Sequence, residues 1–192
     1  LMQPDIVALS LGTRPDCLPE EMISMLSRLR KESGKEIWIE LGLQSIHEKT
    51  AARIHRGYPL SVCQDAYQRL KAADFTVIVH VILGFPWETR AEMLETVRFL
   101  STLQPALDGI KLQLLHVLRG TELGRLYEEA PFPTLTLEDY CSLVVDCLRL
   151  LPSDIVVHRI TGDGPKRLLL APLWSADKKH VLNTLTRAIR EA

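Results

Sequence analysis

Residues 77–83 read VIVHVIL, and the chain continues as GFPWET over residues 84–89. The first seven residues are largely β-branched and would be apolar on both faces of a strand, which is typical of a strand buried in a parallel sheet. A glycine and a proline then interrupt the run. Thr89 begins the helix that we predict for residues 89–103, with Glu92 at the spacing of a capping box. The stretch therefore predicts one strand followed by one helix.

The same order of strand, loop and helix is predicted along the rest of the chain. Besides residues 77–83, strands are predicted at residues 6–11, 37–43, 110–117 and 154–160. Helices are predicted at residues 19–31, 60–73, 89–103, 121–130, 137–151 and 177–191. Buried strands that alternate with helices are typical of a parallel sheet with right-handed crossovers. Five such units fit either an open doubly wound sheet or part of a (β/α) barrel.

The placement of polar side chains within the predicted strands favours the barrel. Glu40 and Gln44 alternate with isoleucine and leucine side chains, and Lys111 and Gln113 likewise share one face of their strand. A barrel uses such a polar face to line its interior, whereas a doubly wound sheet would bury it beneath helices. The sequence therefore predicts an α/β fold that is a partial, TIM-like (β/α) barrel of about five parallel strands. Polar residues merely scattered at strand ends are the alternative interpretation.

The composition is that of one ordinary globular domain. The 192 residues are 46% hydrophobic and 24% charged, and the net charge of −1 does not mark a non-specific binder of polyanions. No apolar run approaches the roughly 18 residues that cross a membrane, and no secretion signal is evident. The scattered cysteines are interpreted as free thiols in a reducing compartment, so we expect a cytoplasmic protein. They are Cys17, Cys63, Cys141 and Cys147.

In a (β/α) barrel the functional site lies at the C-terminal ends of the strands. Here those ends are polar and rich in glycine, and they fall at residues 12–16, 42–45, 84–88, 116–121 and 158–165. Arginine side chains and backbone N–H groups in such loops suit a carboxylate or a ribose-bearing ligand. Neither a Walker A motif nor a GxGxxG fingerprint is present.

Three of these segments resemble the radical S-adenosylmethionine (SAM) superfamily. Residues 40–45 (ELGLQS) and 53–57 (RIHRG) resemble the fourth-strand motif of its oxygen-independent coproporphyrinogen oxidases, methylthiotransferases and elongator-type enzymes. Residues 80–89 (HVILGFPWET) resemble their fifth-strand glycine motif, and residues 13–16 (TRPD) the third-strand turn of the elongator-type branch. With HRITGDGP near the C-terminus and APLW after it, the chain most resembles an uncharacterised bacterial group related to that branch.

The resemblance implies roles for particular residues in binding the cofactor SAM. Gln44 would hydrogen-bond the SAM ribose, and Arg56 would approach the SAM carboxylate or ribose. Glu40 and His80 would be further polar contacts to SAM. Gly84 would let its strand pass close to the adenine, and the backbone of residues 114–117 would pair with the adenine edge.

The resemblance also implies a [4Fe–4S] cluster that this chain does not hold. In the superfamily the cluster cysteines follow the first strand, whereas residues 6–11 resemble the third. We therefore expect residues 1–192 to be the C-terminal portion of a single radical SAM barrel domain, with the first strands and the cluster cysteines missing and no metal ligands present. The full-length enzyme would cleave SAM reductively to a 5′-deoxyadenosyl radical, and this portion would be inactive alone. The exposed sheet edge would favour self-association.

Other residues and functions remain as weaker hypotheses. Contacts to an unknown small-molecule or RNA substrate are assigned to Lys111, Gln113, His158 and Asp163. The first alternative function is a metal-dependent barrel hydrolase, with zinc bound by His80, His116 and His158. The second is a nucleotide-binding or interaction module without chemistry.

Overall fold

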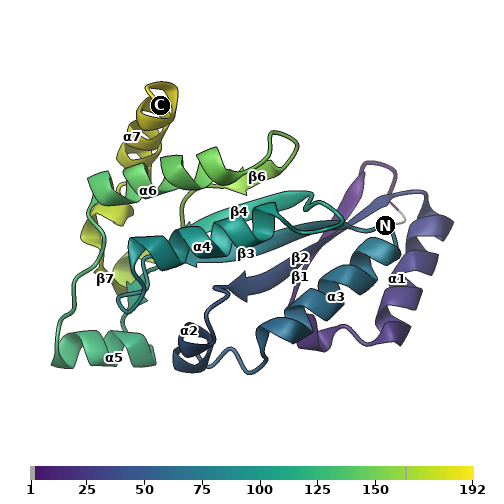
Figure 1. The fold of residues 1–192 in the computed structure, drawn as a ribbon, viewed down its shortest axis with the longest axis horizontal. Helices are drawn as coiled ribbons and strands as arrows, with labels where there is room; N and C mark the ends of the chain where they lie inside the picture. The colour runs from purple at the N-terminus through teal and green to yellow at the C-terminus, as the bar shows by residue number, and fades with distance from the viewer. Residues whose placement is uncertain (1–2, 163) are drawn as a thin grey trace.

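A computed structural model describes residues 3–162 and 164–192 of the chain, and its centre is a five-stranded parallel sheet (Figure 1). The strand order is β1-β2-β3-β4-β6, so each strand lies beside the one before it in the sheet. This confirms the prediction of an α/β fold with five parallel strands. The strands are β1 (Ala8–Thr13), β2 (Glu36–Gln44), β3 (Thr76–Leu83), β4 (Gly109–Leu114) and β6 (Val156–Arg159).

Helices connect the strands, and the longer ones between them cover one face of the sheet (Figure 1). These are α1 (Glu20–Ser33), α3 (Leu60–Ala72), α4 (Arg90–Ser101) and α6 (Leu137–Leu150). The remaining helices lie at the margins and are α2 (Glu48–Arg53), α5 (Glu122–Glu129) and α7 (Lys178–Arg190). Short 3₁₀ turns occur at Pro15–Cys17, Lys166–Leu168 and Leu173–Ala176. None of the helices in the described ranges is long and apolar enough to span a membrane.

Local signals in the sequence define several helix ends. The predicted capping box is confirmed: the Thr89 hydroxyl accepts from the Glu92 amide, and the Glu92 carboxylate accepts from the Thr89 amide at 2.7 Å. Gly34 ends α1 with φ of 63°, in the left-handed region that glycine adopts without steric cost.

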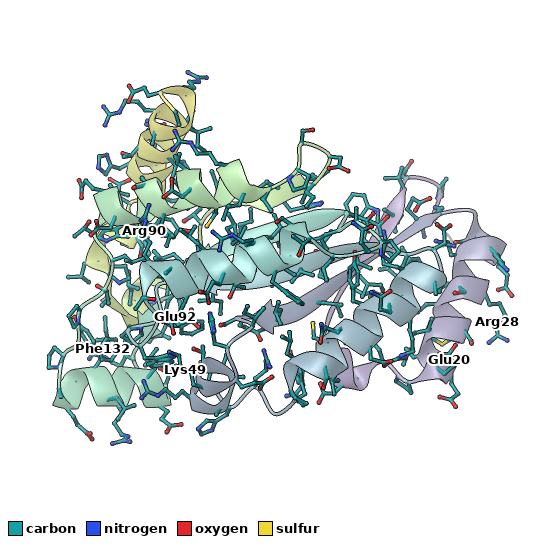
Figure 2. The ribbon with its side chains drawn as sticks, viewed as in Figure 1. Glu20, Arg28, Lys49, Arg90, Glu92 and Phe132 are labelled. Carbon is teal, nitrogen blue, oxygen red and sulfur yellow. The ribbon has the colours of Figure 1, made fainter. Side chains whose placement is uncertain are left out.

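An ion pair of 2.7 Å between Arg90 and Asp146 joins α4 to α6, and Figure 2 labels Arg90.

The two faces of the sheet differ as the strand pattern predicts. In β2 the side chains of Ile37, Ile39, Leu41 and Leu43 are all fully buried against the helices. Each such side chain contributes about 1.5–3 kcal/mol to folding by leaving water. The side chains between them point to the opposite face and remain partly exposed. That opposite face therefore keeps the polar groups, which is the arrangement expected of a barrel interior.

The predicted strand at residues 110–117 is wrong in its C-terminal half. β4 ends at Leu114, and the backbone N–H of Leu115 makes one more bond, to the carbonyl of Leu83. The chain then leaves the sheet, and β5 (Val117–Leu118) pairs antiparallel with β7 (Leu169–Ala171). β7 was not predicted because three residues are too few for an alternating pattern. The ends of β1 and β6 also differ by about two residues from the prediction.

A close backbone contact fixes α5 against β5. A Cβ atom placed on Gly124 would overlap the carbonyl oxygen of Leu118, which also accepts a hydrogen bond of 2.7 Å from the Thr121 hydroxyl. Thr121 in turn caps α5 by accepting from the Gly124 amide at 3.0 Å. Gly124 therefore lets the first turn of α5 lie directly on the backbone that precedes it.

We predict that Gly124→Ala destabilises the protein, although alanine normally stabilises a helix interior by about 0.5–1 kcal/mol over glycine. The cost of overpacking against the Leu118 backbone is about 1–3 kcal/mol. Urea unfolding measures the free energy of both proteins. The control is Gly12→Ala, because a Cβ at Gly12 meets no atom within 4 Å. A gain in stability from Gly124→Ala would contradict the observed packing of α5.

Candidate functional site

A row of hydrogen-bonded polar side chains crosses the open face of the sheet. The Glu40 carboxylate is at its centre: one oxygen accepts from Lys111 Nζ at 2.5 Å and from His80 Nε2 at 2.8 Å. The other oxygen accepts from the Ser10 hydroxyl at 2.6 Å. The second ring nitrogen of His80 lies 3.0 Å from Gln113 Nε2. These residues, which we call the polar row, are Ser10 from β1, Glu40 from β2, His80 from β3, and Lys111 and Gln113 from β4.

The polar row holds two opposite charges and a neutral imidazole. Burial alone would raise the pKa of Glu40, but the hydrogen bonds from Lys111, Ser10 and His80 outweigh it and lower that pKa to about 2. For His80, burial lowers the pKa, and the opposing hydrogen bond to Glu40 does not cancel the effect. At neutral pH Glu40 is therefore ionised and paired with Lys111, while His80 is uncharged.

Gln44 ends β2 at a bulge that turns its side chain onto the open face. The register with β3 shifts between Gly42 and Gln44, and Gln44 has φ of 65°. A Cβ on Gly42 would lie 2.6 Å from Gln44 Nε2, so the Gln44 amide folds over this glycine. The hydroxyl of Tyr58 donates to the Gly42 carbonyl and so stabilises the same turn. Gln44 thus lies on the same face as the polar row.

Arg56 does not reach the open face, because its guanidinium is buried in the loop that follows β2. Nη1 donates to the carbonyls of Leu43 at 3.2 Å and Ser45 at 2.7 Å, and Nε donates to the carbonyl of Tyr58 at 2.9 Å. The side chain is only 2% exposed. Its donors hold the residues on both sides of Gln44. Arg56 therefore positions the Gln44 bulge, whereas the resemblance implied a direct contact to SAM.

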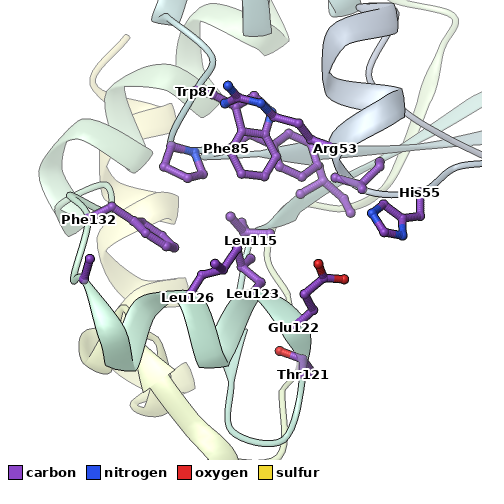
Figure 3. A pocket seen from close by; sticks show the side chains of 14 residues that line it. Arg53, His55, Phe85, Trp87, Leu115, Thr121, Glu122, Leu123, Leu126 and Phe132 are labelled. Atoms are coloured by element: carbon purple, nitrogen blue, oxygen red, sulfur yellow. The ribbon is translucent and has the colours of Figure 1, made fainter.

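A cavity of about 850 Å³ opens at the C-terminal ends of β3 and β4 (Figure 3). Its volume is within the range of ligand sites. Phe85 and Trp87 form one wall and stack with ring centroids 5.5 Å apart. Leu115, Leu123 and Phe132 face them across the opening in Figure 3. The cavity therefore has the form of a slot between the stacked rings of Phe85 and Trp87 and an apolar wall of leucines and Phe132.

Charged groups border this apolar slot at one end. The Arg53 guanidinium lies 5.1 Å from the centre of the Trp87 ring and makes no ion pair within residues 3–162 and 164–192. His55 and Glu122 lie at the same end of the opening in Figure 3. Arg53, Ile54 and His55 of the RIHRG segment line the cavity, whereas Arg56 of the same segment is buried. A ligand in the slot would meet an available arginine beside an aromatic ring.

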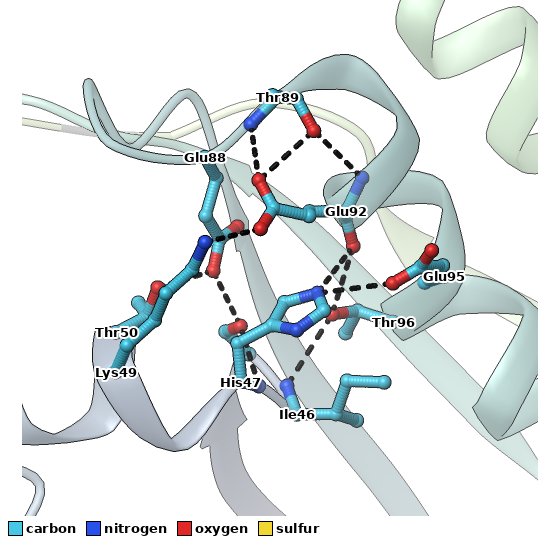
Figure 4. A network of polar contacts seen from close by, with 10 residues as sticks. Ile46, His47, Lys49, Thr50, Glu88, Thr89, Glu92, Glu95 and Thr96 are labelled. Carbon is cyan, nitrogen blue, oxygen red and sulfur yellow. Dashed lines mark hydrogen bonds and ion pairs between the residues drawn. The ribbon is translucent and has the colours of Figure 1, made fainter.

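A buried carboxylate in the loop after β3, the loop that carries the aromatic wall, bonds residues that follow β2 (Figure 4). Glu88 is 8% exposed and accepts from the hydroxyls of Ser45 and Thr50, each at 2.6 Å. Trp87 Nε1 also donates to the Thr50 hydroxyl at 3.1 Å. On the outer side Lys49 pairs with Glu92 of the α4 cap. These bonds link the loop after β3 to the loop after β2 and to α2, and they fix the position of the aromatic wall.

The cavity and the polar row adjoin. Ile82 lines the cavity and pairs with Gln113 across β3 and β4. Leu115, two residues beyond Gln113, lines the cavity as well. The open face of the sheet thus continues from the charged centre of the row to the apolar slot.

Two family models match most of the sequence. The sequence matches the radical SAM superfamily over residues 3–100 and the Radical_SAM C-terminal domain over residues 107–191. The chain belongs to the radical SAM superfamily.

Two curated relatives and one solved structure are similar to most of the chain. The uncharacterized protein YtqA of Bacillus subtilis is 38% identical over 185 residues, and protein YhcC of Escherichia coli is 35% identical over 189 residues. The matches cover 96% and 98% of this chain but 56% and 60% of those proteins, so the chain spans somewhat over half their length. An N-terminally truncated Elp3 from Methanocaldococcus infernus has the same fold, with a TM-score of 0.75 at 24% identity, over 92% of this chain and 42% of that one.

The radical SAM resemblance seen in the sequence is confirmed, and the roles of single residues stay predictions. The structure brings Glu40, Gln44, His80, Lys111 and Gln113 to one face. Of the other predicted site residues, Arg56 is buried behind this face, Gly84 supports a turn, and His158 lies on the face but near the start of β4.

Gly84 supports the turn after β3 with φ of 99°, and a Cβ there would meet Leu135 at 3.3 Å and not the cavity. His158 packs edge-on against Trp38 with ring centroids 5.9 Å apart, near the start of β4. Asp163 lies outside the described residues. The wall of Phe85 and Trp87 lies in the predicted site loop of residues 84–88, whereas the α5 leucines carried no signal of a ligand site.

The four cysteines do not fit an iron–sulfur cluster. Cys63, Cys141 and Cys147 are buried, and Cys17 is exposed on a separate turn. Burial raises the pKa of Cys63 to about 11 and that of Cys147 to about 12, which disfavours the thiolates that ligate iron. Within the described part of the chain, no group of three or more histidine, cysteine or acidic side chains is placed to share a metal ion.

The histidines of the zinc hypothesis do not converge either. His80 is bonded within the polar row, and His158 packs on Trp38. His116 lies against Gly162 and Gly164, where a Cβ would approach its ring to 2.6 Å and 3.2 Å.

We predict that Arg56→Lys lowers the free energy of unfolding by about 1.5–3 kcal/mol, because lysine cannot satisfy the three carbonyls that the guanidinium bonds. The matched control is Arg53→Lys, an exposed residue three positions earlier, for which we expect a change within about 0.5 kcal/mol. Urea unfolding compares the two variants. Equal effects would contradict the role of Arg56 in holding the Gln44 bulge.

We predict that the stability contributed by Glu40 is lost in acid. Its folded pKa of about 2 is below the unfolded value of about 4.3, so the contribution is complete above about pH 4.5 and declines as the pH falls toward 2. The measurement is the free energy of unfolding of the native protein minus that of Glu40→Gln at several pH values. A difference that does not change between pH 5 and 2 would contradict the hydrogen bonding at Glu40.

Proposed function

We propose that this chain supplies the SAM-binding face of a radical SAM enzyme. The observation that carries the proposal is the junction of the polar row with the aromatic slot, at the C-terminal ends of the strands of a radical SAM chain. A nucleoside needs both parts, because its base is planar and apolar on its faces while its sugar is polar.

The cavity fits the adenine portion of such a ligand. Phe85 and Trp87 offer a rigid aromatic wall, and Leu115 and Leu123 close the opposite side. Stacking on aromatic rings and burial between aliphatic side chains are general ways of holding a base. The apolar lining also displaces water from the bound base.

The polar row and Gln44 suit the sugar and amino-acid portions. Gln44 is presented on the open face by the bulge that Arg56 and Tyr58 hold. Arg53 has donors available for a carboxylate at the charged end of the slot. Bound beside a reduced cluster, SAM supplies a 5′-deoxyadenosyl radical. The residues of this chain orient the ligand and exclude water.

The cluster itself is proposed for the full-length protein only. The cysteines of this chain do not fit it, and the chain spans somewhat over half the length of its relatives. We therefore propose that segments of the full-length protein outside this sequence carry the cluster ligands and cover the open face. The sheet edge at β1, which pairs only with β2 among the described strands, is where such segments would add.

Binding of S-adenosylhomocysteine tests the proposal without requiring the cluster or turnover. We expect isothermal titration calorimetry on the full-length protein to detect binding, and Leu123→Trp, which fills the slot, to weaken it more than tenfold. The control is Glu128→Trp, an exposed position on the same helix. Absence of binding to the unmodified protein, or equal affinity in the two variants, would contradict the proposed site.

A further inference from the structure

The direction of the hydrogen bonds in the polar row, from donor to acceptor, is set by Glu40. An ionised carboxylate accepts hydrogen bonds and cannot donate them. Glu40 is held in that form by Ser10, Lys111 and His80. Since His80 Nε2 lies 2.8 Å from a carboxylate oxygen, this nitrogen must carry the hydrogen.

This requirement fixes the tautomer of His80. The ring is uncharged, so its Nδ1 has no hydrogen and is an acceptor. The groups that act on its charge are Glu40, Lys111 and Arg159, and the two cations oppose its protonation. Gln113 lies 3.0 Å from Nδ1 and must therefore present its NH₂ group there.

The side-chain oxygen of Gln113 then has no part in the hydrogen bond to His80. No donor from the described residues bonds it. Gln113 is partly exposed, and it lies on β4 between Lys111, which is paired with Glu40, and Leu115, which lines the cavity. An acceptor of defined orientation therefore lies next to the cavity lining, beside Ile82.

We propose that Gln113 is a specificity-determining residue, whose carbonyl oxygen is aimed at the ligand by Glu40 acting through His80. The group that binds there is a neutral hydrogen-bond donor, such as a hydroxyl or an amino group. A carboxylate, phosphate or keto oxygen is rejected, because it would meet the Gln113 oxygen with lone pairs on both sides. The neighbouring ammonium of Lys111 is already paired. The identity of the ligand as a SAM-type nucleoside rests on the proposed function, but the orientation of Gln113 does not.

The tautomer of His80 is measured by long-range proton–nitrogen NMR on the full-length protein with ¹⁵N-labelled histidine. The His80 signal is identified by its loss in His80→Phe. We expect hydrogen on Nε2 and none on Nδ1. In Gln113→Glu, the ring lies between two acceptors and should become doubly protonated at neutral pH.

The double variant Glu40→Gln with Gln113→Glu exchanges the donor and the acceptor on the two sides of the His80 ring. The carboxylate is now at position 113, and the amide at position 40 can donate to Nε2. We expect a neutral ring again, with the hydrogen moved to Nδ1. Hydrogen on Nδ1 in the unmodified protein, or a neutral ring in Gln113→Glu, would overturn the inference.

The ligand side of the inference is measured with S-adenosylhomocysteine as the probe. Gln113→Leu should weaken its binding roughly 3- to 10-fold, the effect of one neutral hydrogen bond. Gln68→Leu is the control. The Gln68 amide is exposed, lies away from the site and donates to the Gln104 carbonyl at a distance of 2.7 Å. Unchanged binding in Gln113→Leu would overturn the selective role. Failure of the probe to bind the unmodified protein would contradict the proposed function instead, and the His80 tautomer would still decide the orientation of Gln113.

Discussion

The hydrogen bonds that meet at Glu40 are the interaction on which the open face depends. One carboxylate on β2 accepts from side chains of β1, β3 and β4, so a single ionised group joins four neighbouring strands. A buried carboxylate without donors would be costly, and the three donors make its charge stable where water is scarce. The face can therefore stay polar next to a fully apolar layer on the other side of the same strands. Because the two faces differ in this way, the sheet can present polar groups on one side while the other side packs in the hydrophobic core.

Two further buried polar groups shape the ends of the strands. Arg56 donates to the carbonyls on both sides of Gln44, and Glu88 in the loop after β3 accepts from the hydroxyls of Ser45 after β2 and Thr50 in α2. Neither group is exposed enough to contact a ligand directly. Both fix loop backbones that would otherwise move, because loops at the ends of strands have few apolar contacts of their own. The site is thus held rigid by side chains behind it, and the aromatic wall and the Gln44 bulge are present before binding.

Much of this architecture could be predicted from the sequence, because it follows from local patterns. Alternation in β2 and β4 predicted that Glu40, Lys111 and Gln113 share a face, and the capping box at Thr89 was visible in its spacing. The direction of the Arg56 side chain was not predictable, since it depends on the left-handed conformation at Gln44, a non-glycine residue. The α5 side of the cavity escaped prediction, because the position of α5 depends on one backbone contact at Gly124.

Formation of 5′-deoxyadenosine by the full-length protein tests the central claim most directly. The protein would be reconstituted anaerobically with iron and sulfide, its iron content measured, and SAM and dithionite added. We expect 5′-deoxyadenosine well above the amount formed without protein, because the open face and the slot would hold SAM beside the cluster. Iron-loaded protein that forms no more than that background would contradict the assignment of this face to SAM cleavage.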